Sequence, residues 1–486
     1  MTKDDADVDQ VVTRAQRAFE TARDSSPQDR AQWMGAIADS LESHRAELVA
    51  LAGEETHLPE GRLQGELTRT SFQLRLLAED LLTGEPLEAT IDHADETWGM
   101  GPRPDIRRVN VPLGVVGVFG ASNFPFAFSV IGGDSAAALA AGCAVVHKIH
   151  EAHPALGRRT TELVTEALAA AGAPTDLFQA VSTRADGEAL VDHPLVRAVS
   201  FTGSERVGRL LMERAASRPE PIPFYGELGS INPVFVTRRA WEERGASIAA
   251  EYVQSFTLGM GQFCTKPGLL ITPTLSEEDT RALVDAVGEV SPSPMLTPQL
   301  AEGFIAARSE MAERQVRALA PGGTGTAPAP ALFTTTAAEV TEDPQIMREE
   351  MFGPASIVVQ YENEQELAQV AELLEGQLTA TVQGEEGDDV EELLAALEAR
   401  TGRVLWNGWP TGVSVTYAQQ HGGPFPATTA PTTTSVGTAA VRRFMRPVAY
   451  QNLPDPLLPP SLQDANPWGI ARRVDGRWTG PQAGKP

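Results

Sequence analysis

Two short apolar runs decide the fold of this chain: Val115-Val116-Gly117-Val118-Phe119 and Val145-Val146-His147-Lys148-Ile149. Both are compact and rich in β-branched residues, which is typical of buried strands. The segment between them, from Asp134 to Ala141, is rich in alanine and favours a helix. Two buried strands joined by a helix form a βαβ unit with parallel strands. The sequence therefore predicts an α/β fold around a parallel sheet.

The same pattern continues after this unit. Helical patterns at 156–171 and 187–190 alternate with strand patterns at 178–181 and 198–201. This order predicts a doubly wound parallel sheet. A second α/β region begins near Pro233 and runs to about Gly412, and amphipathic helices are predicted before the first sheet, up to about Leu82.

Two further segments differ from the α/β regions. Residues 87–108 contain short, partly alternating runs separated by Gly and Pro, which predict an exposed hairpin that pairs with another subunit. The tail from Ala427 is rich in Thr and Pro, and we expect it to be weakly structured up to Pro486.

Charge and cysteine content exclude several classes of function. The 486 residues carry a formal net charge of −26, which argues against binding to nucleic acid or to an anionic membrane. The acidic runs at 4–7 and 385–392 are interpreted as solubilising surface segments. Two cysteines cannot form a disulfide framework, so we expect a cytoplasmic protein, and the Met1–Asp5 start shows no secretory signal. No metal site is expected.

One cysteine lies in a setting that suits chemistry. Cys264 stands in the uncharged run 261–265, whereas Cys143 lies in an apolar run and is interpreted as a small core residue. Glu227 precedes Cys264 along the chain, so a thiol nucleophile and a carboxylate base form one hypothesis. Asn123, directly after a predicted strand, offers an amide donor for an oxyanion, although an Asn in a loop is also an ordinary turn residue.

A nucleotide-binding site is suggested by two weaker signals. The chain contains no GxGxxG fingerprint. The run 201–204, Phe-Thr-Gly-Ser, follows a strand and opens a helix, where backbone N–H groups can bind a pyrophosphate or where Ser204 can be a plain N-cap. Lys148 ends a predicted strand at the edge used by ligands, although a solvated lysine fits there as well.

Taken together, these motifs make the chain similar to the NAD(P)-dependent aldehyde dehydrogenase superfamily over nearly its whole length. The segments that carry the resemblance occur in the family's order: Asn123-Phe124-Pro125, Lys148, Phe201-Thr202-Gly203-Ser204, Glu227-Leu228-Gly229, Gly261-Gln262-Phe263-Cys264 and Glu350-Met351-Phe352-Gly353-Pro354.

The resemblance implies a role for each matched residue. Cys264 would be the nucleophile, Glu227 the general base for deacylation, and Asn123 an oxyanion donor together with the Cys264 backbone N–H. The cofactor-binding residues would be Lys148 at the adenosine ribose, Gly203 and Ser204 near the pyrophosphate, Glu350 at the nicotinamide ribose and Phe352 beside it.

The resemblance is stronger to one subgroup, the α-ketoglutaric semialdehyde (2,5-dioxopentanoate) dehydrogenases. The runs that carry it are 104–108, 119–125, 230–233, 421–428 and 446–452. We therefore expect oxidation of 2,5-dioxopentanoate to 2-oxoglutarate. A medium-chain or long-chain fatty aldehyde dehydrogenase, a thiol esterase or acyltransferase without hydride transfer, and a catalytically silent structural protein remain alternatives.

Cofactor and substrate preference depend on fewer residues. Glu151, three positions after Lys148, would accept hydrogen bonds from ribose hydroxyls and repel a 2′-phosphate, which favours NAD over NADP. A substrate pocket is expected among four aromatic residues, Phe124, Phe128, Phe263 and Phe425. No arginine can be assigned to a substrate carboxylate from the sequence.

The family fold implies a division of the chain. Two doubly wound parallel-sheet domains are expected: an NAD(P)-binding domain at 1–86 and 111–226, and a catalytic domain at 227–426. Residues 87–110 and 427–486 would form an oligomerisation arm and tail. The expected assembly is a homodimer or a homotetramer.

Overall fold

The fold begins with four helices that pack beside the first sheet. The structure is a computed structural model that describes residues 7–480, so the acidic run from Asp4 to Ala6 and the end of the tail lie outside it. Ser26 and Asp29 form a capping box at the start of the second helix. The predicted amphipathic helices are confirmed as α1 (Val8–Ala22), α2 (Pro27–Ser43), α3 (Arg45–Thr56) and α4 (Glu60–Thr83).

The first sheet is wholly parallel, with the order β5-β4-β3-β6-β7. All residues of its two central strands, β3 and β4, are buried, as their apolar sequences predict. The order reverses at β3, so a crevice for ligands is expected at the carboxyl ends of β4, β3 and β6. Its strands are β3 (Val115–Phe119), β4 (Ala144–Lys148), β5 (Phe178–Val181), β6 (Val196–Thr202) and β7 (Phe224–Glu227), and its helices α5 (Gly133–Ala141), α6 (Pro154–Ala170), α7 (Arg184–Asp192) and α8 (Glu205–Ala216).

The second sheet has the order β10-β11-β12-β9-β8-β13-β14. It is parallel except at β10, which runs antiparallel to β11 because only a short loop, 322–330, joins the two strands and leaves no room for a crossover helix. Its strands are β8 (Val234–Val236), β9 (Leu269–Pro273), β10 (Arg317–Pro321), β11 (Ala331–Thr336), β12 (Ala355–Tyr361), β13 (Gln377–Gln383) and β14 (Thr401–Trp406). Its helices are α9 (Arg238–Thr257), α10 (Glu277–Gly288), α11 (Pro298–Ala312), α12 (Ala337–Glu342), α13 (Gln365–Leu373) and α14 (Glu391–Glu398).

A third sheet, β15-β2-β1-β16-β17, joins the predicted hairpin to the tail. The hairpin is confirmed, but the expectation of a weakly structured tail is wrong, because the edges of the hairpin strands offer unpaired N–H and C=O groups that the tail strands satisfy. The strands are β1 (Thr90–Asp92), β2 (Ile106–Pro112), β15 (Met445–Gln451), β16 (Arg472–Val474) and β17 (Arg477–Thr479). Short 3-10 helices complete the fold: η1 (Glu85–Leu87), η2 (Leu258–Gly261), η3 (Pro344–Met347), η4 (Thr438–Phe444), η5 (Asp455–Leu457) and η6 (Pro460–Leu462).

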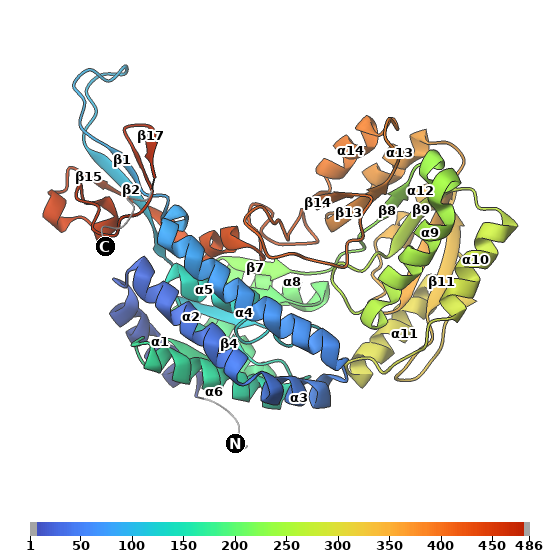
Figure 1. The fold of residues 1–486 in the computed structure, drawn as a ribbon, viewed down its shortest axis with the longest axis horizontal. Helices are drawn as coiled ribbons and strands as arrows, with labels where there is room; N and C mark the ends of the chain where they lie inside the picture. Colours follow the sequence, from blue (N-terminus) through green and yellow to red (C-terminus); the bar gives the residue numbers. More distant parts are fainter. Residues whose placement is uncertain (1–6, 481–486) are drawn as a thin grey trace.

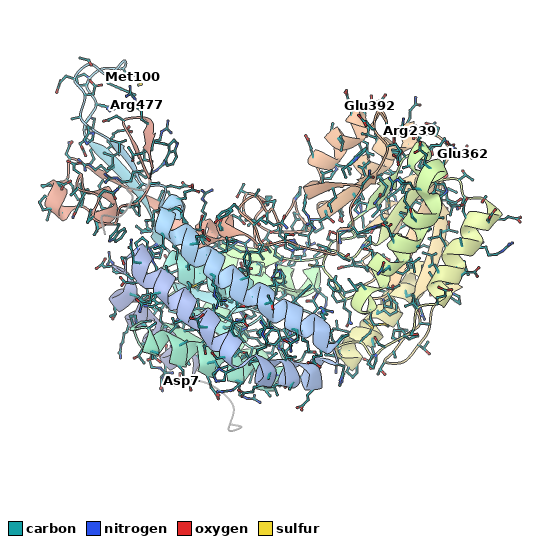
Figure 2. The ribbon with its side chains drawn as sticks, viewed as in Figure 1. Asp7, Met100, Arg239, Glu362, Glu392 and Arg477 are labelled. Atoms are coloured by element: carbon teal, nitrogen blue, oxygen red, sulfur yellow. The ribbon has the colours of Figure 1, made fainter. Side chains whose placement is uncertain are left out.

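The three sheets occupy different parts of the molecule. Figure 1 shows the first sheet and helices α1 to α6 in the lower body. The second sheet lies at the right of this view, and the third sheet projects from the body at the upper left. Figure 2 places Met100 at the far tip of the hairpin, where its side chain is 96% exposed. Among residues 7–480, every helix is too short or too polar to cross a membrane.

Candidate active site

The loop that carries Cys264 is shaped by three consecutive left-handed residues. Gly259, Met260 and Gly261 have φ angles of 55°, 59° and 63°, directly after α9. A Cβ on Gly261 would lie 2.1 Å from the carbonyl oxygen of Gly353, so this position requires glycine. The close approach brings the Cys264 loop against the loop before β12, which contains Glu350.

The Cys264 thiol lies beside a histidine that the motif search did not assign. Its sulfur is 3.7 Å from Nε2 of the buried His421. Burial, together with the charges of Glu227 and Glu350, raises the pKa of Cys264 to about 12. Burial lowers the pKa of His421 to about 3, assisted by neighbouring arginines. A protonated thiol therefore faces a neutral imidazole at 3.7 Å.

Glu227 ends β7 and is only 4% exposed. Its Oε1 lies 3.5 Å from Nη2 of the buried Arg443, whose Nη1 donates to Oδ1 of Asp134 at 2.7 Å. Burial, opposed by the charge of Arg443 and assisted by that of Asp134, raises the pKa of Glu227 to about 8. A carboxylate that titrates near neutral pH suits a general base.

Asn123 lies on the loop after β3 and contacts the Cys264 segment. Its Nδ2 donates to the carbonyl oxygen of Gln262 at 3.0 Å, two residues before Cys264. The loop is held from α4, because Nη2 of Arg62 donates to the carbonyl oxygen of Asn123 at 2.6 Å. An amide has two N–H donors, so one remains for a substrate oxygen.

A cavity of about 520 Å³ lies at the carboxyl ends of β3, β4 and β6. A Cβ on Gly203 would be 2.6 Å from the Phe201 ring, so a larger residue would require that ring to move. Ser204 caps α8, and among the described residues its side chain makes no capping bond, so the N–H groups of the first turn stay open to an anion. Lys148 lies 3.6 Å from Oε1 of Glu151 at this cavity. These features fit a dinucleotide with its pyrophosphate at α8 and a ribose at Lys148.

Glu350 approaches the same region from the opposite sheet. A Cβ on Gly229 would lie 3.0 Å from Oε2 of Glu350. The Glu350 carboxylate therefore lies next to Gly229, which is two residues after Glu227. Burial raises the pKa of Glu350, and the charge of Lys266 opposes that rise. Nζ of Lys266 donates to the carbonyl oxygens of Met351 and Ala355, 2.8 Å each, which fixes the loop. Phe352 is half-buried on that loop.

Three of the four predicted pocket aromatics form one cluster. The ring centroids of Phe124 and Phe128 are 5.3 Å apart, and those of Phe124 and Phe263 are also 5.3 Å apart. Phe128 continues to the His421 ring at 6.0 Å. Phe425 is 48% exposed and lies by Arg209 of α8, 5.8 Å from the guanidinium carbon to the ring centroid. The structure thus does not bring Phe425 to the aromatic cluster.

Comparison with known proteins decides the family. The sequence profile of the aldehyde dehydrogenase family matches residues 1–425 of this chain. The chain belongs to the aldehyde dehydrogenase family. It is 45% identical over 487 residues to alpha-ketoglutaric semialdehyde dehydrogenase 2 of Azospirillum brasilense, covering 97% of this chain and 92% of that protein. It is 42% identical to the alpha-ketoglutaric semialdehyde dehydrogenase of Acinetobacter baylyi, covering 97% and 91%.

Solved structures support the fold of this aldehyde dehydrogenase. Aldehyde dehydrogenase C of Pseudomonas syringae, in complex with NAD+ and octanal, superposes with a TM-score of 0.78 at 22% identity and covers 91% of this chain and 88% of that one. The aldehyde dehydrogenase-like α/β architecture expected from the sequence is therefore confirmed. The protein is an oxidoreductase that oxidises an aldehyde to an acid with NAD(P)+.

Three residues close to the active site of this aldehyde dehydrogenase were missed by sequence reasoning. His421 contacts Cys264, and Arg443 contacts Glu227, each from a chain segment more than 150 residues away. Lys266 was missed because a lysine is rarely expected in a protein core. His421 opens one of the runs that carry the subgroup resemblance, and this position was the only signal that could have identified it.

Proposed function

We propose that this aldehyde dehydrogenase converts 2,5-dioxopentanoate to 2-oxoglutarate. The names of the two relatives at 45% and 42% identity support this substrate, since each aligns with 97% of the chain. The observation that carries the proposed chemistry is the group around the thiol: His421 at 3.7 Å from the Cys264 sulfur, with Glu227 and Glu350 close enough to raise its pKa.

The proposed reaction starts at the thiol. The sulfur of Cys264 adds to the aldehyde carbon while Nε2 of His421 accepts the thiol proton, which gives a thiohemiacetal. The side-chain amide of Asn123 and the backbone N–H of Cys264 hold the oxyanion. Lys148 and Ser204 would hold NAD(P)+ in the cavity that they line, and the cofactor would accept the hydride as the thiohemiacetal becomes a thioester.

Deacylation is assigned to Glu227. Its carboxylate takes a proton from a water molecule, and the hydroxide adds to the thioester carbon. The acid then leaves as the Cys264 thiolate takes back the proton held by His421, and Glu227 releases its proton to solvent. Each cycle thus turns an aldehyde and water into an acid, with two electrons passed to the cofactor. Glu350 and Phe352 are proposed to position the nicotinamide end, and Gly203 to allow the pyrophosphate to approach the backbone.

The substrate proposal predicts a preference that kinetics can measure. We expect kcat/KM for 2,5-dioxopentanoate to exceed that for pentanal and for a long-chain aldehyde by roughly tenfold or more, about 1.4 kcal/mol in the transition state. Reduced-cofactor formation by the purified protein measures each value. A preference for the long-chain aldehyde would instead assign the protein to fatty aldehydes and leave its mechanism unchanged.

The cofactor proposal is NAD. The carboxylate of Glu151 lies at the cavity beside Lys148, where it would repel the 2′-phosphate of NADP. We expect Glu151→Ala to shift the ratio of kcat/KM values toward NADP by about tenfold, because it removes a like charge. Glu162→Ala, an exposed change on α6 that lies away from the cavity, serves as control. An unchanged ratio in Glu151→Ala, or a wild type that prefers NADP, contradicts the proposal.

The assembly, the location and the domain division are proposals of the same kind. The hairpin exposes Trp98 and Met100 at its tip, and such apolar groups favour a contact with another subunit in a homodimer or homotetramer.

Both cysteines are free, which suits a cytoplasmic protein, and the charge of −26 disfavours nucleic acid and anionic membranes as partners. The division into 1–86 with 111–226, 227–426, and 87–110 with 427–486 is supported by the three separate sheets.

A further inference from the structure

One face of α4 presents three charged side chains to the active site. Arg62, Glu66 and Arg69 follow the spacing i, i+4 and i+7, which places them on the same side of a helix. The first two hold the Asn123 loop: Arg62 donates to the Asn123 carbonyl oxygen, and Oε1 of Glu66 accepts from two backbone N–H groups of that loop, at 2.8 and 3.0 Å. Their positions are explained by the loop they support.

The two terminal nitrogens of Arg69 hold no loop in this way within the described residues. Its Nε donates at 3.4 Å to the carbonyl oxygen of Val413, and its buried Nη1 and Nη2 have no hydrogen-bond partner within residues 7–480. Buried guanidinium N–H groups that stay unpaired cost free energy. A ligand that accepts from both nitrogens removes this cost, and a carboxylate has the matching two-oxygen geometry.

The unpaired guanidinium lies along the aromatic cluster that leads to the nucleophile. The guanidinium carbon of Arg69 is 5.0 Å from the centroid of the Phe128 ring. That ring is 6.0 Å from the His421 ring, whose Nε2 is 3.7 Å from the Cys264 sulfur. The positive charge of Arg69 acts on both neighbours, since it lowers the pKa of His421 and opposes the rise in that of Cys264. Phe128 and His421 thus connect the Arg69 guanidinium to the thiol through successive contacts.

A second arginine near the thiol is already occupied. Arg403 of β14 donates from Nη1 to the carbonyl oxygen of Gly412 and from Nη2 to that of Pro410, 3.0 Å each. Its charge also acts on Cys264, so it adds to the positive potential while its two terminal nitrogens hold the following loop. Among the described residues, Arg62 and Arg403 each leave one buried nitrogen unpaired, Nη1 and Nε, whereas Arg69 leaves both of its terminal nitrogens unpaired.

We infer that Arg69 binds a carboxylate at the far end of the substrate while the aldehyde carbon faces Cys264. The inference rests on the proposed function and makes it more specific: the preferred substrates are short aldehydes that carry a carboxylate at the opposite end. The buried arginines of α4 and β14 explain how a protein of net charge −26 receives an anion in its active site.

The test compares three variants with three aldehydes. Arg69→Met removes the charge and keeps the length, Arg69→Lys keeps the charge without the two-pronged geometry, and Arg75→Met is the control. Arg75 lies on the same helix, is 47% exposed and pairs with Asp39. The aldehydes are 2,5-dioxopentanoate, 5-oxopentanoate and pentanal, the last having no carboxylate. Oxidation of pentanal also shows that each variant is folded and competent.

We expect Arg69→Met to lower kcat/KM for the two carboxylated aldehydes by roughly tenfold or more, mainly through KM, and to leave pentanal within a few-fold of wild type, so that the preference over pentanal is lost. Arg69→Lys should recover part of the loss, and Arg75→Met should behave as wild type. If Arg69→Met keeps the wild-type preference for carboxylated aldehydes, or loses all three substrates equally, the assignment of Arg69 is wrong.

The same measurements separate this inference from the proposed substrate. A wild type that favours 5-oxopentanoate over 2,5-dioxopentanoate, with that preference over pentanal lost in Arg69→Met, overturns the substrate and supports Arg69. If the wild type prefers 2,5-dioxopentanoate and Arg69→Met keeps the same preference, the proposed substrate is supported and the role of Arg69 is overturned. A wild type with no preference for carboxylated aldehydes overturns both.

Discussion

Cys264→Ala should lower turnover of any aldehyde by at least roughly 10⁴-fold and leave cofactor binding intact. The thiol is the only group proposed to bond to the aldehyde carbon, so its loss removes the covalent route itself. The cavity beside Lys148 and Ser204 is lined by other residues, so it should be unaffected. Steady-state assays measure turnover, and fluorescence titration with the reduced cofactor measures binding.

The other cysteine provides the control. Cys143 is fully buried, and its sulfur donates to the carbonyl oxygen of Phe444 at 3.4 Å, so Cys143→Ala tests a structural cysteine. We expect that variant to unfold at a somewhat lower temperature while its kcat stays near that of wild type. Retained turnover in Cys264→Ala would refute the nucleophile assignment, and lost cofactor binding would show that the change had damaged the fold.

Glu227→Gln should uncouple the two halves of the reaction. Gln has the same shape but cannot accept a proton from water, so we expect kcat to fall by roughly 10² to 10⁴-fold. The first half of the reaction does not need this base in our scheme. A rapid burst of reduced cofactor, about one per active site, should therefore precede the slow steady state, and stopped-flow absorbance measures it.

The pH dependence provides a second measure of the same residue. Because burial raises the pKa of Glu227 to about 8, the carboxylate is mostly protonated below that pH and ionised above it. The kcat of the wild type should thus rise as the pH increases through 8, and this rise should be absent in Glu227→Gln. Glu213→Gln, an exposed change on α8, should keep it. A variant that turns over at the wild-type rate without a burst would exclude Glu227 as the base.

The central strands, and several candidate residues at the sheet edge where ligands are expected, could be predicted from the sequence because their signals are local. An apolar run such as that of β3 shows its burial in a few residues. The family's motifs then indicated Cys264, Glu227 and Asn123, and the structure places all three around one point. Glycines such as Gly261 are also local signals, since the positive φ and the close contact belong to a single position.

The remaining features depend on contacts between distant segments. Nothing near His421 in the sequence shows that it faces Cys264, because the two lie 157 residues apart. The tail was expected to be weakly structured because its Thr and Pro content masks the strand β15, which forms only when it pairs with β2. Arg69 could not be distinguished from Arg75 by sequence, since the difference lies in which side of α4 faces the thiol.

The ion pairs of Glu227 have a consequence for the newly synthesised protein. Arg443 joins Glu227 to Asp134, a residue 309 positions earlier in the chain. During translation the first sheet can form as soon as its strands have left the ribosome, but Glu227 then has no cationic partner. The enzyme should therefore acquire deacylation activity only at the very end of synthesis, and ribosome-bound chains stalled before Arg443 should bind cofactor without turning over.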